Sequence, residues 1–211
     1  MRIINLDTWP RRQHFQLFNQ FDYPHFNLCA NVDITQWYTA VKANNLNFTI
    51  ATVYLLARVA NEITPFRWRI REGQVIEHDI VHPSHTITTE SDLFSFCTIP
   101  YDPDFTIFAP RAATTIAHFT QNPTLEDEPG QDNLLYLSAI PWVSFTGLMH
   151  PIHMHPVDSV PRIVWGKFFR NGDQWQMPLS VQAHHALLDG FHVGQYFNQV
   201  QTYLDEPQQL F

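Results

Sequence analysis

One predicted helix, at residues 49–63, carries apolar side chains on nearly all of its faces. These side chains are Ile50, Val53, Tyr54, Leu55, Leu56, Ala57, Val59 and Ala60. A helix of this kind has to be buried on most sides, so other elements must surround it. Its apolar run is interrupted by Arg58 and is shorter than the roughly 20 residues that a bilayer requires. The pattern therefore predicts a buried core helix, and we expect no membrane span.

The elements expected around this helix are both helical and extended. Helices are expected at residues 11–21, from residues 33–35 to Asn44, at 104–119 and at 191–204. Strands are expected at residues 66–71, 74–78, 86–89, 134–139, 141–146, 162–170 and 175–183, and an exposed acidic loop at residues 121–132. Interspersed helices and strands predict an α/β or α+β fold, with a mixed sheet flanked by helices.

Length, charge and cysteine content narrow the class of protein. A chain of 211 residues is enough for one well-buried domain, which we expect to span residues 1–211. The formal net charge is −8 and the basic residues are scattered, which disfavours nucleic-acid binding. Cys29 and Cys97 form neither a disulfide framework nor a CxxC metal signature. Because Asn5 and Asp7 also break the first apolar run, we expect no signal peptide and a cytoplasmic location.

The most informative segment for chemistry is HHALLDG, residues 184–190. Apolar and polar side chains alternate in the strand before it, and His185 continues the apolar face. Burial at that position favours the neutral imidazole, which is the form that a general base needs. Asp189 and Gly190 mark the turn into the last helix, where Asp189 can cap backbone N–H groups.

Other interpretations of these histidines have to be weighed. Two histidines followed by Asp-Gly fit a polar strand end with a helix cap about as well. A metal site at His185 and Asp189 would need a third ligand, and none stands nearby at a fixed spacing. Ser180 is a poor nucleophile, since it lies on the opposite strand face and the chain has no Gly-x-Ser-x-Gly turn. HPIHMH, residues 150–155, suggests zinc only superficially, and a polar rim near the substrate is favoured.

Residues 184–193, HHALLDGFHV, resemble the HHxxxDGFHV signature of the chloramphenicol O-acetyltransferases. The acyltransferase cores of 2-oxo acid dehydrogenases share the HxxxDG part. Three more blocks match in family order: residues 9–15 resemble W-x-R-[KR]-x-H-F, residues 66–83 resemble F-R-x-x-I-x-x-G…D-x-V-H-P, and residues 141–145 resemble P-W-V-x-F. The resemblance extends from residue 9 to about residue 206. We expect neither a lipoyl-dependent acyltransferase nor a condensation domain, because the first needs a preceding lipoyl domain and the second a much longer chain.

The resemblance implies a homotrimer that transfers acetyl directly from acetyl-CoA to a hydroxyl of chloramphenicol, at active sites between subunits. His185 would be the general base that removes the hydroxyl proton. Asp189 would be mainly structural and would pair with Arg11 of the amino-terminal segment. Phe18 matches an aromatic position that lines the acceptor pocket in the family. Neither an acyl-enzyme nor a metal is implied.

Two positions differ from the family where the chemistry would be affected. Gly147 stands in place of a serine that helps to stabilise the oxyanion, and strand alternation points Ser144 and Thr146 to the other face. Val164 stands in place of a threonine. Losing one oxyanion donor costs on the order of 10²-fold in rate. The sequence thus leaves open slow chloramphenicol acetylation, acetylation of a different small alcohol, and a non-catalytic relative that binds small molecules.

Overall fold

The computed structural model describes residues 1–90, 93–126, 128 and 130–211. Its helices are α1 (Arg12–Phe18), α2 (Thr35–Ala43), α3 (Phe48–Glu62), α4 (Phe105–Gln121) and α5 (Gly190–Asp205), with the short 3-10 turns η1 (Thr64–Arg67) and η3 (Pro207–Gln209). Its strands are β1 (Arg2–Ile3), β2 (His25–Asp33), β3 (Trp68–Arg71), β4 (Gln74–Glu77), β5 (His82–Thr88), β6 (Phe94–Thr98), β7 (Leu134–Ile140), β8 (Arg162–Gly166), β9 (Phe169–Asn171) and β10 (Gln174–His184).

The strands form one large mixed sheet and one small antiparallel sheet. The large sheet has the order β2-β10-β8-β7-β5-β6, and β9 pairs with β10 beside this path. The β5–β7 and β7–β8 pairs are parallel, whereas β2, β6 and β9 join in antiparallel register. The small sheet has the order β1-β4-β3. A mixed sheet flanked by helices is the predicted fold class, which is therefore confirmed.

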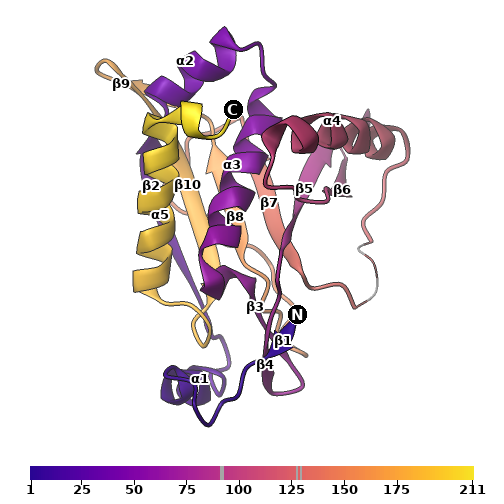
Figure 1. The fold of residues 1–211 in the computed structure, drawn as a ribbon, viewed down its shortest axis with the longest axis vertical. Helices are drawn as coiled ribbons and strands as arrows, with labels where there is room; N and C mark the ends of the chain where they lie inside the picture. Colours follow the sequence, from indigo (N-terminus) through magenta and orange to yellow (C-terminus); the bar gives the residue numbers. More distant parts are fainter. Residues whose placement is uncertain (91–92, 127, 129) are drawn as a thin grey trace.

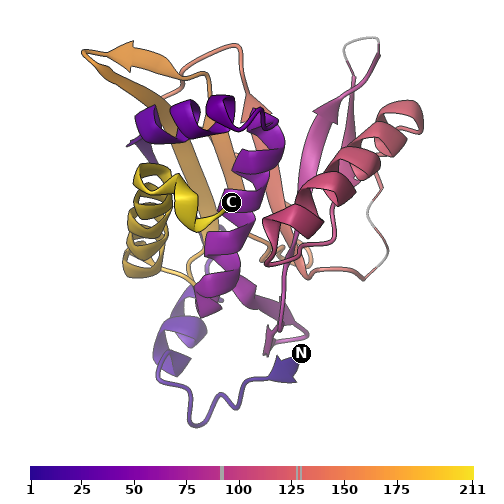
Figure 2. The same cartoon turned by 45° about the horizontal axis from the view of Figure 1, so that its top comes forward.

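Helix α3 lies in the middle of the helical layer. Figures 1 and 2 show α5, α3 and α4 in front of the large sheet, with α2 across one end. Asn47 caps α3 by accepting a hydrogen bond from the N–H of Ile50 at 3.1 Å. Ten of its 15 residues are buried, which agrees with the all-round apolar pattern. The prediction of a buried core helix is confirmed.

The sheet face turned away from the helices is polar. By register, Asn27 and Cys29 of β2 neighbour Gln182 and Ser180 of β10 on this face, and Val164 of β8 follows. Residues 141–161 cover this face. One contact between them and the sheet is the hydrogen bond from the N–H of His150 to the side chain of Gln182, at 2.8 Å. Ser180 also lies within 3.5 Å of the carbonyl of Leu148. The large sheet thus separates an apolar, helix-covered face from a polar face covered by one irregular segment.

Two of the predicted strands are corrected by the structure. Residues 141–146 are irregular, because the carbonyl of Val143 accepts from Lys167 N–H at 3.0 Å and Ser144 donates its hydroxyl to the Lys167 carbonyl. The expected strand at 162–170 is divided into β8 and β9 after Gly166. A Cβ at Gly166 would lie 3.0 Å from the ring of Phe145, so this close approach favours glycine.

Strands β1, β2 and β6 were not predicted. The sequence of β2 nevertheless alternates cleanly, with Phe26, Leu28, Ala30 and Val32 between polar residues or Cys29. This period of two is the signal of a strand and was sufficient to find it. The acidic loop was predicted at residues 121–132, but Gln121 is still the last residue of α4, so the loop begins at residue 122. Residues 127 and 129 of this loop lie outside the described residues.

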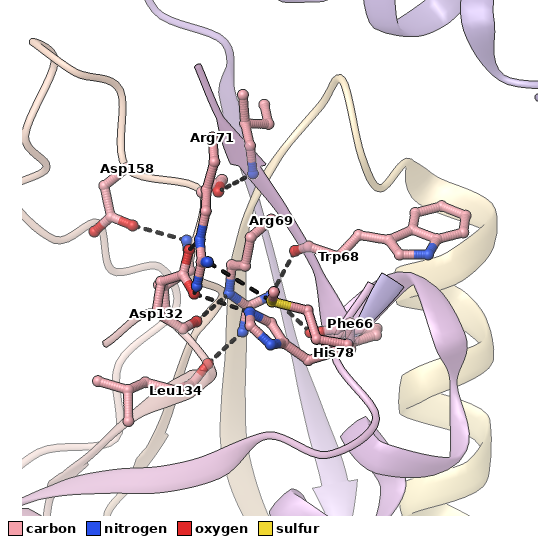
Figure 3. A network of polar contacts seen from close by, with 12 residues as sticks. Phe66, Trp68, Arg69, Arg71, His78, Asp132, Leu134 and Asp158 are labelled. Atoms are coloured by element: carbon pink, nitrogen blue, oxygen red, sulfur yellow. Dashed lines mark hydrogen bonds and ion pairs between the residues drawn. The ribbon is translucent and has the colours of Figure 1, made fainter. Parts of the chain in front are cut away.

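A buried arginine joins the two sheets. The guanidinium of Arg69 is completely buried and donates to the carbonyls of Phe66, Trp68, Asp132 and Leu134. Figure 3 shows these carbonyls around the Arg69 side chain, with Arg71 and His78 on the Asp132 carboxylate. Arg69 therefore fixes β3 of the small sheet to the start of β7 in the large one.

Candidate active site

Strand β10 delivers two adjacent histidines to one end of the large sheet. Leu179, Val181 and Ala183 are fully buried beneath the helices, and the strand ends at His184. His185 is the next residue, and its N–H donates to the carbonyl of Pro24 at 2.7 Å. The turn that carries His185 is therefore tied to the chain just before β2.

The imidazole of His185 lies between two aromatic rings. Phe18, the last residue of α1, stacks on it with ring centroids 3.9 Å apart and an interplanar angle of 14°. Phe26 of β2 lies at 4.8 Å and is tilted by 46°. The His185 Nδ1 atom is buried and has no hydrogen-bond partner among the described residues. A substrate can therefore reach the imidazole only at Nε2, and the ring plane is set by packing.

Asp189 holds the start of the last helix and an arginine from the other end of the chain. As the cap of α5 it accepts from the N–H groups of Phe191 at 3.0 Å and His192 at 3.4 Å. Arg11 donates to its other carboxylate oxygen at 2.6 Å. Burial alone would raise the pKa of Asp189, but the Arg11 hydrogen bond and the nearby His192 lower it to about 2.

Arg11 connects the two segments that frame the imidazole. It immediately precedes α1, the helix that carries Phe18, and its carbonyl accepts from the N–H of Phe15 at 2.9 Å. Its guanidinium reaches the turn that carries His185 through Asp189. Side-chain exposures of 14% for Arg11 and 26% for Asp189 make this a largely desolvated ion pair. The structure thus brings together all four residues singled out in the sequence, and their roles in chemistry stay predictions.

The fully buried imidazole at this end of β10 is that of His184, whereas His185 is only half-buried. Burial favours a neutral imidazole, and this argument applies more strongly to His184 than to His185, the predicted base. Burial lowers the pKa of His184 to about 3, and nearby His25 adds to the lowering. His184 points to the polar face of the sheet, where its ring and that of His25 form a T-shaped pair with centroids 5.0 Å apart.

This buried imidazole makes stability depend on pH. Between its ordinary value of 6.5 and about 3, an unfolded chain binds a proton at His184 that the folded chain does not. Lowering the pH through this window therefore removes stability. We expect the free energy of unfolding to fall by about 2 kcal/mol from pH 7 to pH 5 on account of His184. Urea unfolding at several pH values measures it, and the slope should be shallower in His184→Asn; equal slopes would contradict it.

The positions that differ from the family lie on or beside the polar face. Val164 is buried, and its register neighbours are Ser138 on β7 and Ser180 on β10. Two hydroxyl-bearing residues therefore flank the position where one is missing, which sequence reasoning did not find. Gly147 is exposed, and a Cβ there would meet nothing within 4 Å. Since residues 141–146 form no strand, alternation does not decide where Ser144 and Thr146 point.

The structure offers no organised metal site in its described residues. No group of three or more histidine, cysteine or acidic side chains is placed there to hold an ion. Of the histidines at 150–155, His150 is half-buried against the sheet, where its N–H binds Gln182. The pKa of His150 is lowered by burial and by nearby Arg162. The segment is part of the cover of the polar face.

Two hollows on the described surface lie away from His185. One, of about 530 Å³, lies between α3, η1 and α5 and includes Glu62 and Asn198. The other, of about 310 Å³, lies between the amino-terminal segment and β3 and includes Trp9 and Trp68. His185 lines neither of these two hollows.

The sequence of this chain has clear relatives among known proteins. A sequence model of the family described as chloramphenicol acetyltransferase matches residues 1–201. The chain belongs to the chloramphenicol acetyltransferase family. A chloramphenicol acetyltransferase of Klebsiella sp is 33% identical over 208 residues, which cover 97% of this chain and 94% of that protein. One from Streptomyces acrimycini is 34% identical over 207 residues, with the same coverage of both chains. The expected family and the expected acyltransferase class are confirmed.

Solved structures place the chloramphenicol acetyltransferase fold on the whole chain. A chloramphenicol acetyltransferase structure superposes with a TM-score of 0.87 at 26% identity, covering 96% of this chain and 99% of its own. A probable dihydrolipoamide acetyltransferase from Listeria monocytogenes has a TM-score of 0.70 at 15% identity, covering 98% and 95%, and shares the fold. Within the described residues of this family member, no helix has the length and apolarity needed to cross a bilayer.

Proposed function

We propose that the protein transfers an acetyl group from acetyl-CoA to a hydroxyl of chloramphenicol. Family membership over nearly the whole chain carries this proposal. It is supported by the HHxxxDG turn, where His185 is held between Phe18 and Phe26 and the Asp189–Arg11 pair fixes the following helix. The two free cysteines and the use of acetyl-CoA favour a cytoplasmic location.

His185 acts as the general base in this mechanism. Its Nε2 removes the proton from the acceptor hydroxyl as the oxygen attacks the thioester carbonyl of acetyl-CoA. The new C–O bond gives a tetrahedral oxyanion, the C–S bond then breaks, and coenzyme A leaves with the proton returned by the imidazolium. No covalent acyl-enzyme is needed. General-base assistance contributes on the order of 10²–10⁴-fold, and holding both substrates in place supplies much of the rest.

The active site is proposed to lie between subunits of a homotrimer. Exposed apolar side chains stand on the segments that contact or follow His185: Leu17 and Phe21 near Phe18, Tyr23 next to Pro24, and Phe191 after Asp189. Large exposed apolar groups gathered around one functional group favour a protein interface. In this arrangement a second subunit supplies the other wall of the pocket around His185. Light scattering should give the mass of three chains, and a monomer would contradict this arrangement.

A thiol-release assay tests the proposed reaction. The purified protein is incubated with acetyl-CoA and chloramphenicol, and free coenzyme A is measured with a thiol reagent. We expect release that depends on both substrates and is absent from a blank without acceptor. A folded protein that releases no thiol with chloramphenicol would contradict the assigned acceptor, and a screen of small alcohols would follow.

The missing serine hydroxyl at Gly147 predicts a gain of activity. Because a Cβ at this exposed glycine meets nothing within 4 Å, Gly147→Ser should fold like the parent chain. A new hydroxyl there would donate to the oxyanion, and one such donor is worth up to about 10²-fold. We expect Gly147→Ser to raise kcat about tenfold, with Gly147→Ala as the matched control. Equal kcat for the two variants would show that the hydroxyl does not limit the reaction.

A different small alcohol is the second candidate acceptor. Gly147 and Val164 replace the two hydroxyl residues that the family resemblance predicts, and this difference at the chemical centre favours a shifted acceptor. A non-catalytic relative would instead bind chloramphenicol tightly without turnover. Equilibrium binding of chloramphenicol, measured beside thiol release, separates these outcomes. A non-catalytic protein would bind chloramphenicol but release no coenzyme A with any acceptor, whereas an enzyme with another acceptor would release coenzyme A with that alcohol.

A further inference from the structure

The turn that carries His185 is hydrogen-bonded to His184. The carbonyl of His184 accepts from the N–H groups of Leu187 and Leu188, each at 3.0 Å. Its side chain turns back on the same segment, where Nδ1 accepts from the N–H of Ala186 at 3.2 Å. Among the described residues, the His184 imidazole is the one hydrogen-bond acceptor of the Ala186 N–H. Main chain and side chain of His184 together hold the three residues that follow His185.

The hydrogen bond to Ala186 fixes the protonation of the His184 ring. A backbone N–H can only donate, so Nδ1 must be without a proton. Neutral His184 therefore carries its proton on Nε2, and that atom has no partner among the described residues. A doubly protonated ring would turn an Nδ1–H toward the Ala186 N–H, two donors facing each other. The turn is compatible only with the neutral ring.

The groups facing His184 maintain this neutral form. The ring of His25 in β2 forms a T-shaped pair with it, and the Nε2 of His25 donates to the carbonyl of Asp158 at 2.8 Å. Arg162 of β8 is paired with the Asp158 carboxylate, so this negative charge is already engaged. His185 is also close to His184, and the ring of Tyr23 lies 5.9 Å from that of His25. Burial, His25 and His185 oppose a proton on His184 and Asp158 favours one, and the net effect is a lowered pKa.

We propose that His184 is a positioning residue for His185. In its neutral form with the proton on Nε2, it anchors the Ala186 N–H and so sets the backbone from which the His185 ring enters the space between Phe18 and Phe26. The inference rests on the proposed function, in which His185 is the base. A displacement of about 1 Å at a catalytic group can cost on the order of 10²-fold in rate, so one anchoring hydrogen bond has a measurable effect on kcat.

Two substitutions distinguish positioning from mere packing. His184→Asn places an amide oxygen near the site of Nδ1, so it can still accept from Ala186, whereas His184→Ala cannot. We expect His184→Ala to lower kcat about 30-fold with KM changed less than about threefold. His184→Asn should recover at least about tenfold of that loss. His118→Ala, at an exposed position on α4, is the matched control and should keep kcat within about twofold.

A spectroscopic measurement decides the case even where a variant folds poorly. Imidazole ¹⁵N shifts of the wild-type protein, recorded between pH 5 and 8, should show His184 neutral with its proton on Nε2 throughout. A proton on Nδ1 would overturn the proposal, and so would equal kcat for folded His184→Ala and His184→Asn. Absence of acetyl transfer in the wild-type protein would instead overturn the proposed function, and the ¹⁵N shifts would still test the His184 geometry.

Discussion

Replacing His185 with alanine is expected to lower kcat/KM for acetyl transfer by about 10³-fold while the protein stays folded. The imidazole is the one group between Phe18 and Phe26 that can accept the proton of an attacking hydroxyl. Loss of a general base typically removes 10²–10⁴-fold of the rate, and about 10³ is the middle of that range. Thiol release at several acceptor concentrations measures kcat and KM separately, and the loss should fall on kcat.

The control for this prediction is a histidine outside the site. His118→Ala on α4 should keep kcat/KM within about twofold, since its side chain is exposed. Circular dichroism of His185→Ala should match the parent protein, because the half-buried ring leaves the Asp189–Arg11 pair and the His184 turn intact. A folded His185→Ala that retained a tenth of the activity would be incompatible with a base at this position.

The second large effect concerns folding, at the buried arginine between the two sheets. Replacing Arg69 with methionine is expected to lower the free energy of unfolding by about 3–5 kcal/mol, because a buried hydrogen-bond network loses its donor. Methionine has a similar length, but it leaves the carbonyls of Phe66, Trp68, Asp132 and Leu134 without the donor seen in Figure 3. Buried carbonyls that lose their partner carry the full desolvation cost.

Urea unfolding of Arg69→Met beside Arg71→Met gives the comparison. Arg71 is partly exposed and binds the Asp132 carboxylate, so its loss should cost about 1 kcal/mol or less. Equal stability of the Arg69→Met and parent proteins would show that other groups or water satisfy the four carbonyls. In that case β3 would not depend on Arg69 for its attachment to β7.

The helices of this protein could largely be predicted from local pattern. The all-round apolar run of α3, the cap at Asp104 of α4 and the Asp189-Gly190 start of α5 are signals contained in a few neighbouring residues. Strand β2 carries an equally clear alternation, although it is not among the expected strands. Residues 141–146 misled because their apolar content resembles a strand, whereas their polar groups bind Lys167 instead of a neighbouring ladder.

The site depended on contacts that no local pattern contains. The family motif singled out His185, Asp189, Arg11 and Phe18, but the stacking of Phe18 and the tilted contact of Phe26 on the imidazole required α1 and β2 to meet the end of β10. The flanking of Val164 by Ser138 and Ser180 follows from register across three strands. Burial of His184 beside His25 likewise arises only when β10 pairs with β2. These are properties of the folded sheet.

Identification of the product is the most direct test of the central claim. The wild-type protein is incubated with chloramphenicol and acetyl-CoA labelled with ¹³C in the acetyl group, and the acceptor is analysed by mass spectrometry and NMR. We predict a labelled acetyl ester on a chloramphenicol hydroxyl, formed in step with coenzyme A release. Unchanged chloramphenicol, recovered beside folded protein and intact acetyl-CoA, would contradict the assignment of this chain as an enzyme that acetylates chloramphenicol.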